Sequence, residues 1–177
     1  MDMELTYIYH SGFALSGDGF TVIMDYYRDS EDGQAQADLN RLMDGTFSNQ
    51  EAGMPEGTVH SELLRRPGKL YVLASHFHPD HFNKEVLQWR EQRPDIIYIF
   101  SKDILRHRRA QKEDAVWLKK GEEYKDETLS VRAFGSTDVG VSFLLQTGGK
   151  KIFHAGDLNN WHWKEESTEE EVREAEN

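Results

Sequence analysis

The feature that most constrains this chain is a cluster of metal-ligand side chains directly after an apolar run. Residues 70–74, Leu-Tyr-Val-Leu-Ala, are apolar and rich in strand-forming residues, which predicts a buried strand. The pattern His-x-His-x-Asp-His follows, with its ligand-type side chains at His76, His78, Asp80 and His81. Imidazole and carboxylate groups are ligands that zinc and similar divalent ions favour. His76 and His78 can chelate one ion. Asp80 and His81 can turn toward a second.

The composition is typical of a globular chain the size of one domain. Of 177 residues, 37% are hydrophobic and 30% are charged, so residues 1–177 are expected to form a single domain. No apolar run approaches the roughly 18 residues that cross a membrane, and the N-terminus lacks the pattern of a secretory signal. No cysteine is present, which excludes disulfides and thiolate ligands. We therefore expect a cytoplasmic protein with no membrane contact.

The net charge of −11 bears on the kind of partner. An acidic chain is a poor match for a polyanion, which argues against nucleic acid and favours a small-molecule substrate. The one basic cluster, residues 106–109 with Lys112, is interpreted as a solvated helix face. Much of the negative charge lies in residues 165–177, which carry seven glutamates and one arginine.

The hydrophobic pattern predicts strands interleaved with helices, and therefore α and β layers. Strands are expected over residues 5–15, 20–24, 70–74, 96–100, 115–118, 129–134, 139–147 and 151–155, and helices over 83–94 and 101–105. Residues 29–68 are polar and rich in turn formers, so they are interpreted as an insertion: a surface excursion or a lid over the site.

Four sequence blocks together resemble the metallo-β-lactamase superfamily, in particular its lactonase-like branch. Besides the histidine motif, they are residues 9–13 (Tyr-His-Ser-Gly-Phe), residues 24–25 (Met-Asp) and residues 153–157 (Phe-His-Ala-Gly-Asp). The resemblance covers residues 4–30 and 69–163. It implies a four-layer αββα sandwich with metals at the edge between two sheets. It also places His10 and Asp25 near the metal pocket, but not as ligands.

The resemblance also implies a ligand set. Asp157 follows the last expected strand, and Gly156 allows the sharp turn that returns its carboxylate to the site. It matches the family's carboxylate that bridges two metals. The implied metal ligands are therefore His76, His78, Asp80, His81 and Asp157. Two divalent ions are expected, with zinc first and manganese or iron as alternatives.

The chain departs from the family pattern where a further histidine is usual. Residues 135–138 read Gly-Ser-Thr-Asp there. Ser136 is a poor zinc ligand, whereas Asp138 can serve as an oxygen donor. His154 and His162 are the other candidates for that place.

The C-terminal end is the second departure, because no later strand supplies the family's last metal-binding histidine. Ser167 and Thr168 begin a capping-box pattern, but few residues follow it. We therefore expect a C-terminally truncated chain whose second sheet is incomplete. Apolar surface left exposed by the missing part predicts self-association into a homo-oligomer.

The resemblance and the metal motif predict a metal-dependent hydrolase that uses a metal-bound hydroxide on an ester, lactone or phosphodiester substrate. Asp80 is the expected catalytic residue, orienting the nucleophile and acting as general base. One alternative is a non-catalytic metal-binding module or an inactive fragment of such a hydrolase. A di-iron redox enzyme on the same fold is a weaker alternative, because such relatives carry Glu where this chain has His78.

Overall fold

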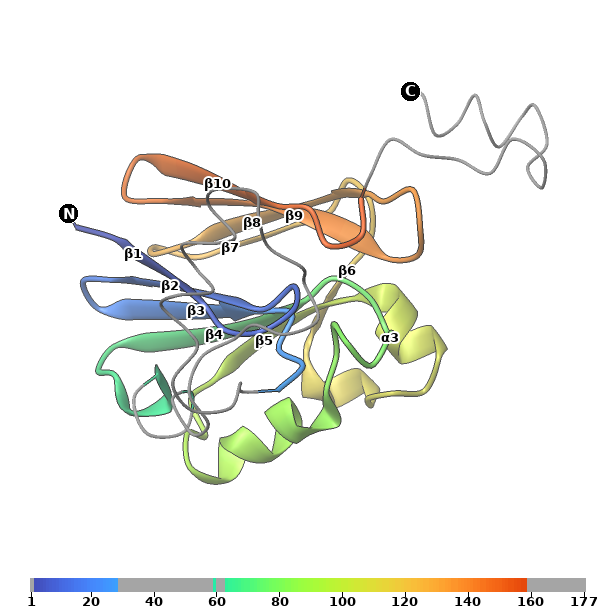
Figure 1. The fold of residues 1–177 in the computed structure, drawn as a ribbon, viewed down its shortest axis with the longest axis horizontal. Helices are drawn as coiled ribbons and strands as arrows, with labels where there is room; N and C mark the ends of the chain where they lie inside the picture. The colour runs from blue at the N-terminus through green and yellow to red at the C-terminus, as the bar shows by residue number, and fades with distance from the viewer. Residues whose placement is uncertain (1, 29–58, 60–62, 159–177) are drawn as a thin grey trace.

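The structure is a computed structural model that describes residues 2–28, 59 and 63–158. Two β-sheets pack face to face, and helices cover the outer face of the larger sheet (Figure 1). The six-stranded sheet runs in the order β1 (Glu4–Tyr7), β2 (Phe13–Gly17), β3 (Phe20–Met24), β4 (Lys69–Ala74), β5 (Ile97–Ser101) and β6 (Val116–Leu118). The four-stranded sheet runs in the order β10 (Lys150–His154), β9 (Val141–Thr147), β8 (Ser130–Gly135) and β7 (Glu123–Lys125).

The helices of the described residues are short. They are the 3-10 helices η1 (Leu63–Arg65), η2 (Lys84–Glu91) and η3 (Lys112–Asp114) and the α-helix α3 (Lys102–Arg106). The predicted mixed α/β class is confirmed, with a helical layer and two sheets in the expected order. Within residues 2–28 and 63–158, no helix lies over the outer face of the four-stranded sheet (Figure 1). No described helix is long and apolar enough to span a bilayer.

The direction of the strands determines where side chains can converge. β1, β2 and β3 pair antiparallel, whereas β3, β4, β5 and β6 pair parallel. The carboxyl ends of the parallel strands therefore meet at one edge of the sheet, which is where α/β proteins usually build binding sites. The four-stranded sheet is antiparallel throughout.

Alternation along β4 builds two cores, one on each side of the larger sheet. Val72 and Ala74 pack toward the helices with Phe82, while Tyr71 and Leu73 pack against the second sheet. Both faces of β4 are buried, as is usual for a parallel strand, so the strand reads as a continuous apolar run. The first polar side chains after that run therefore mark the end of the strand.

The prediction of one strand over residues 5–15 is wrong. The chain ends β1 at Tyr7, turns, and begins β2 at Phe13. The turn is closed by the N–H of Ile8 donating to the Gly12 carbonyl at 2.8 Å and the N–H of Gly12 donating to the Tyr9 carbonyl at 2.8 Å. The hairpin with β3 is as predicted, but its first strand is β2.

Other predicted elements are present, but their helix type or capping differs from the prediction. The helix expected over 83–94 is the 3-10 helix η2, and Asn83 caps it because its side-chain oxygen accepts the N–H of Glu85 at 2.9 Å. Ser101 precedes α3, but its side chain makes no capping hydrogen bond. β7 was not predicted, because a three-residue strand of alternating charge resembles a loop in sequence.

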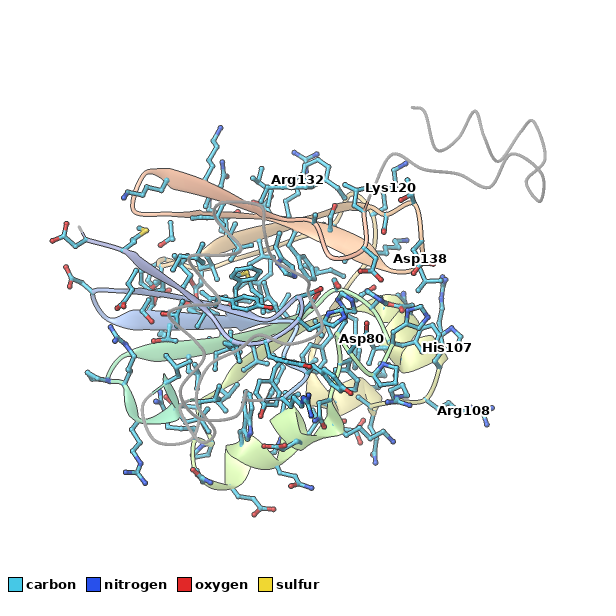
Figure 2. All side chains as sticks on the ribbon, viewed as in Figure 1. Asp80, His107, Arg108, Lys120, Arg132 and Asp138 are labelled. Atoms are coloured by element: carbon cyan, nitrogen blue, oxygen red, sulfur yellow. The ribbon has the colours of Figure 1, made fainter. Side chains whose placement is uncertain are left out.

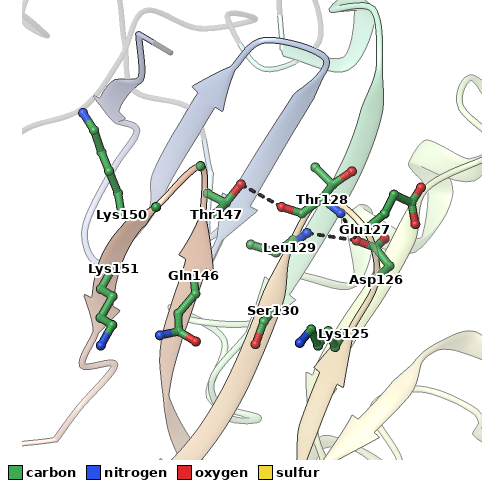
Figure 3. Close-up of a pocket in the computed structure, with 12 residues that line it drawn as sticks. Lys125, Asp126, Glu127, Thr128, Leu129, Ser130, Gln146, Thr147, Lys150 and Lys151 are labelled. Atoms are coloured by element: carbon green, nitrogen blue, oxygen red, sulfur yellow. Dashed lines mark hydrogen bonds between the residues drawn. The ribbon is translucent and has the colours of Figure 1, made fainter.

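One carboxylate, Asp126, holds the turn between β7 and β8 (Figure 3). Its Oδ1 accepts the backbone N–H groups of Thr128 at 2.8 Å and Leu129 at 2.9 Å. Its Oδ2 accepts from Lys69 Nζ at 3.0 Å, Tyr71 Oη at 2.8 Å and Tyr124 Oη at 3.0 Å. Burial alone would raise the pKa of Asp126, but these hydrogen bonds outweigh it and hold the pKa well below its usual range.

We expect Asp126→Ala to lower the free energy of unfolding by about 2 kcal/mol near neutral pH, since it removes several hydrogen bonds to one charged group. Because folding lowers this pKa, the stabilisation is present above the usual value of 3.8 and is lost as the pH falls below it. Urea denaturation of both proteins near neutral pH and near pH 3 (about one unit below that value) measures the difference. The exposed neighbour Glu127 is the control, and Glu127→Ala is expected to change stability by less than about 0.5 kcal/mol. An unchanged gap at acid pH would contradict this account.

Candidate metal centre

The candidate site lies where the loops that follow β3, β4 and β10 meet the turns between β1 and β2 and between β8 and β9. Asp25 follows β3, and the histidine motif follows β4. Asp138 lies in the turn between β8 and β9, and Asp157 follows β10. Figure 2 shows Asp80 and Asp138 at the same end of the molecule. Both sheets therefore contribute side chains to one place.

Two groups of potential ligands form there. The first consists of His76, His78, Asp138 and Asp157, and the second of His10, Asp80 and His81, with the ligand atoms of each group within 4.8 Å of one another. In the first group, His78 Nδ1 lies 3.7 Å from Asp138 Oδ2. In the second, His10 Nε2 and His81 Nε2 each lie 3.5 Å from Asp80 Oδ2.

Asp157 faces both groups with separate oxygens. Its Oδ2 lies 3.4 Å from His76 Nε2 in the first group. Its Oδ1 lies 3.0 Å from His81 Nε2 in the second group. A carboxylate that bridges two ions through both of its oxygens presents them in this way.

The buried imidazoles fit a metal ion better than they fit hydrogen bonding. His76 Nε2 and His81 Nε2 are buried and have no aligned hydrogen-bond partner, although Asp157 is close to both. Buried polar atoms are nearly always paired, so two such nitrogens require an explanation. Ligands about 2.0–2.2 Å from one tetrahedral ion lie roughly 3.3–3.6 Å apart. The separation of His76 Nε2 from Asp157, 3.4 Å, and that of His81 Nε2 from Asp80, 3.5 Å, fall in this range. The donor set therefore fits divalent metal.

The other ring nitrogen of each buried imidazole is held by a neighbour. His76 Nδ1 lies 3.0 Å from Ser75 Oγ, and His81 Nδ1 lies 2.8 Å from Asp25 Oδ2. Such contacts orient a metal-binding ring, and in metalloproteins they commonly come from carboxylates. Both rings thus direct Nε2 toward the interior of the site.

Asp25 is fully buried and helps to orient the ligand histidines. Its Oδ1 accepts the backbone N–H of Ser75 at 2.7 Å, and its Oδ2 accepts Ser75 Oγ at 2.6 Å. The same Oδ2 contacts His81 Nδ1 and His154 Nε2, each at 2.8 Å. Burial raises the pKa of Asp25, but His154 and His81 outweigh it and hold the pKa well below its usual range. Asp25 therefore stays ionised behind the ligands.

The two buried histidines of the motif, His76 and His81, have pKa values shifted in opposite directions. Burial and the neighbouring His81 lower the pKa of His76, against the opposing effect of Asp25 and Asp157. Burial also lowers the pKa of His81, but the hydrogen bond that its Nδ1 donates to Asp25, together with the nearby carboxylates, outweighs this effect, so that pKa is raised. A neutral His76 is the form that binds metal.

Two glycines allow the loops to converge. A Cβ on Gly140 would lie 2.2 Å from the Ser75 carbonyl oxygen, and one on Gly156 would lie 2.7 Å from Ser75 Oγ. Both residues have positive φ, which is readily available only to glycine. The segments that carry Asp138 and Asp157 can therefore press directly against the histidine motif.

Pockets among the described residues differ in how close they lie to the candidate site. One, of about 340 Å³, opens beside the site between β1, β2 and β10; its lining includes Leu5, Tyr7, His10, Phe13, Met24, Ile152 and His154. The other, of about 350 Å³, lies at the opposite end of the second sheet, by the Asp126 turn (Figure 3). The first is lined in part by His10 of the second ligand group, whereas the lining of the other contains no member of either group.

Sequence comparison supplies the family. Residues 4–172 match the family model of the β-lactamase superfamily domain, which is nearly the whole chain. This chain belongs to the β-lactamase superfamily. Among curated proteins, none matches the sequence.

Solved structures with this β-lactamase superfamily fold include proteins of more than one chemistry. Igni18, a metallo hydrolase from Ignicoccus hospitalis, is 19% identical with a TM-score of 0.58, over 88% of this chain and 61% of its own. A protein from Veillonella parvula described as a possible metal-dependent hydrolase is 14% identical with a TM-score of 0.57, over 99% of this chain and 67% of its own. CmlA, a diiron β-hydroxylase from Streptomyces venezuelae, is 16% identical with a TM-score of 0.57, over 90% of this chain and 30% of its own.

These similarities show that the chain has the fold of the β-lactamase superfamily. Its chemistry must be argued from the residues of the site. This chain spans about three fifths of the length of Igni18 (61%) and under a third of CmlA (30%). Metal binding by this chain is supported by its own two ligand groups.

The structure brings together all five metal ligands predicted from the superfamily resemblance. Asp138 joins the first group, at the place where Ser136 replaces the usual histidine. His154 does not fill that place, because its Nε2 contacts Asp25 instead. His162 and the acidic end at 165–177 lie outside the described residues, as does most of the insertion at 29–68.

His10 is the one member of the two groups that the sequence interpretation left out as a ligand. A strand was predicted through it, so the turn that directs its ring toward Asp80 was not anticipated. The signal was the small, flexible pair Ser11-Gly12, which follows His10 directly and favours a turn.

Proposed function

We propose that this chain is a metal-dependent hydrolase that cleaves an ester, lactone or phosphodiester bond in a small-molecule substrate. The observation that carries the proposal is Asp157, whose two oxygens face the two ligand groups and so suit a paired metal centre. When bound, divalent ions of this kind lower the pKa of water to about 7 and polarise a carbonyl or phosphoryl group.

The residues divide between two ions. His76, His78 and Asp138 would hold the first, and Asp80 and His81 would hold the second, with Asp157 shared. Nitrogen and oxygen donors without thiolate suit zinc, and also manganese or iron. Zinc is the first expectation, because tetrahedral sites built from histidine and carboxylate are common for it.

Asp80 is the group best placed to handle the attacking water. Its side chain is 38% exposed, whereas that of His81 beside it is fully buried. One carboxylate oxygen faces the imidazoles, and the exposed side of the group can orient water and accept its proton. Asp80 would therefore both contribute to the second group and act as general base.

The pocket beside His10 supports a substrate with an apolar part. Its walls include Leu5, Tyr7, Phe13 and Ile152, and its lining also contains His10 of the second ligand group. Ligand pockets are usually mostly apolar with a few polar groups that fix the reacting atoms. A lactone or ester with a hydrocarbon or aromatic substituent fits this description, which favours the lactonase-like branch over phosphodiester cleavage.

Metal analysis combined with a hydrolysis screen tests the proposal. The protein is loaded with Zn²⁺, desalted and analysed for metal, then assayed on an aromatic lactone, a nitrophenyl ester and bis(nitrophenyl) phosphate. Two ions per chain with turnover of any one substrate class are expected. One ion or none, without turnover, would instead support a non-catalytic metal-binding module.

A pair of matched histidine variants makes the screen specific to the site. His78→Ala is expected to lose most of the turnover with the first ion. His107→Ala removes an exposed imidazole that stacks on Phe77 but belongs to neither ligand group, and should retain both ions and turnover. Equal activity in the two variants would show that the hydrolysis arises elsewhere.

A further inference from the structure

We propose that His10 is a direct ligand of the second metal ion, together with Asp80, His81 and Asp157. This inference rests on the proposed function, since it names a residue that completes the same centre. Without His10, the second group would hold its ion with one imidazole and the carboxylates of Asp80 and Asp157. With it, the ion has two imidazoles and two carboxylates, the usual number of ligands for zinc.

The ring of His10 is arranged like those of His76 and His81, the two buried histidines of the motif. His10 Nδ1 lies 3.1 Å from Ser11 Oγ, just as His76 Nδ1 contacts Ser75 Oγ. Its other nitrogen, Nε2, points to the carboxylate of Asp80. In all three rings a neighbour holds Nδ1 while Nε2 faces a carboxylate of the site, which is the arrangement that fixes a metal-binding imidazole.

The distance from His10 to Asp80 suits a shared ion better than a direct bond. The two atoms, His10 Nε2 and Asp80 Oδ2, are 3.5 Å apart. A charge-assisted hydrogen bond would be about 2.7–2.9 Å. Two ligands of one tetrahedral zinc ion are roughly 3.3–3.6 Å apart. His81 Nε2 lies at the same 3.5 Å from Asp80 Oδ2, so both rings approach the carboxylate equally.

The backbone at His10 is held in a conformation that this residue type adopts at a cost. Its φ is 55°, in the left-handed region that favours glycine. Gly12 keeps the turn tight, since a Cβ there would lie 2.9 Å from the Tyr9 carbonyl oxygen. Tyr27 packs edge-on against the imidazole, with ring centroids 6.3 Å apart. Such strain at a non-glycine residue tends to persist where function requires it.

The test is zinc stoichiometry in His10→Asn, because asparagine tolerates positive φ and is a poor zinc ligand. Protein loaded with Zn²⁺ is desalted and analysed by elemental analysis, and the affinities are measured by competition with a chelator. We expect two ions in the unaltered protein and one in the variant, with at least a 100-fold loss of affinity for the other. Asp80→Asn should lose the same ion, and His107→Asn, the exposed control, should keep both.

The outcomes separate this inference from the function on which it rests. Two ions of unaltered affinity in a folded His10→Asn variant would overturn the ligand assignment and leave the hydrolase proposal standing. No zinc in the unaltered protein would overturn the hydrolase proposal itself. If His10→Asn fails to fold, as judged by circular dichroism, His10→Asp decides, since aspartate tolerates the same backbone and supplies an oxygen ligand. It should then retain two ions, and a single ion in it would count against the assignment.

Discussion

Asp157→Ala is expected to abolish the paired metal centre, with the largest effect of any single substitution in this chain. The carboxylate faces His76 on one side and His81 on the other, so its removal takes a ligand from both ions at once. Loss of a supporting group behind a metal ligand typically costs 10–100-fold in affinity, and loss of a shared ligand should exceed about 100-fold for each ion. Zinc analysis after desalting should find at most one ion per chain.

The same variant should lose hydrolysis by about three orders of magnitude or more, in line with removal of groups that act as a unit in catalysis. Asp138→Ala provides a graded comparison, because Asp138 contacts only the first group and should weaken only one ion. Asp18→Ala, in the exposed turn between β2 and β3, is the control for loss of an aspartate and should change nothing. Two ions retained in Asp157→Ala would refute the bridging role.

The second large effect is expected at Asp25, and it concerns stability even without metal. Asp25→Asn keeps the size of the side chain and tolerates the positive φ of 47°, but it removes the charge that Ser75, His81 and His154 share. Breaking a buried charged pair by removing one partner typically costs about 3–5 kcal/mol. We expect a loss of this size in urea denaturation of the metal-free protein near neutral pH.

The free energy of unfolding at acid pH tests whether the ionised carboxylate of Asp25 is the source of this stabilisation. Folding lowers the pKa of Asp25, so its stabilisation is present above the usual value of 3.8 and disappears as the pH falls below it. The difference between the unaltered protein and Asp25→Asn should therefore shrink in acid. Zinc affinity should fall about 10–100-fold in the variant, because His81 loses the contact that orients its ring. A variant as stable as the unaltered protein would show that the charge is not required.

The sequence predicted most of the fold because its strands carry strong local signals. β4 and β5 are apolar on both faces, and β8 alternates, so each is recognisable without tertiary information. The break at Tyr9 was missed because Leu5 to Leu15 keeps strand periodicity across the turn. The antiparallel pairing of β1 with β2, which places Leu5 opposite Leu15, shows that a turn divides this segment.

The site was predictable where its ligands are neighbours in sequence. His76, His78, Asp80 and His81 lie in one loop, so their spacing alone indicated metal. The contact between His81 and Asp25 joins residues 56 positions apart, and no local pattern encodes it. His10 likewise reaches the second group only through the turn after β1 and the pairing of β2, β3 and β4. Roles set by such distant pairings emerge only from the folded chain.

The convergence of loops at Gly140 and Gly156 has a consequence for kinetics. The proposed ligands are spread from His10 to Asp157, and the two sheets must pack before the segments that carry them come to one place. Contacts of such long sequence separation form late in folding. Bound ions should therefore act mainly on the unfolding rate: they should lengthen the lifetime of the native state and leave the refolding rate nearly unchanged.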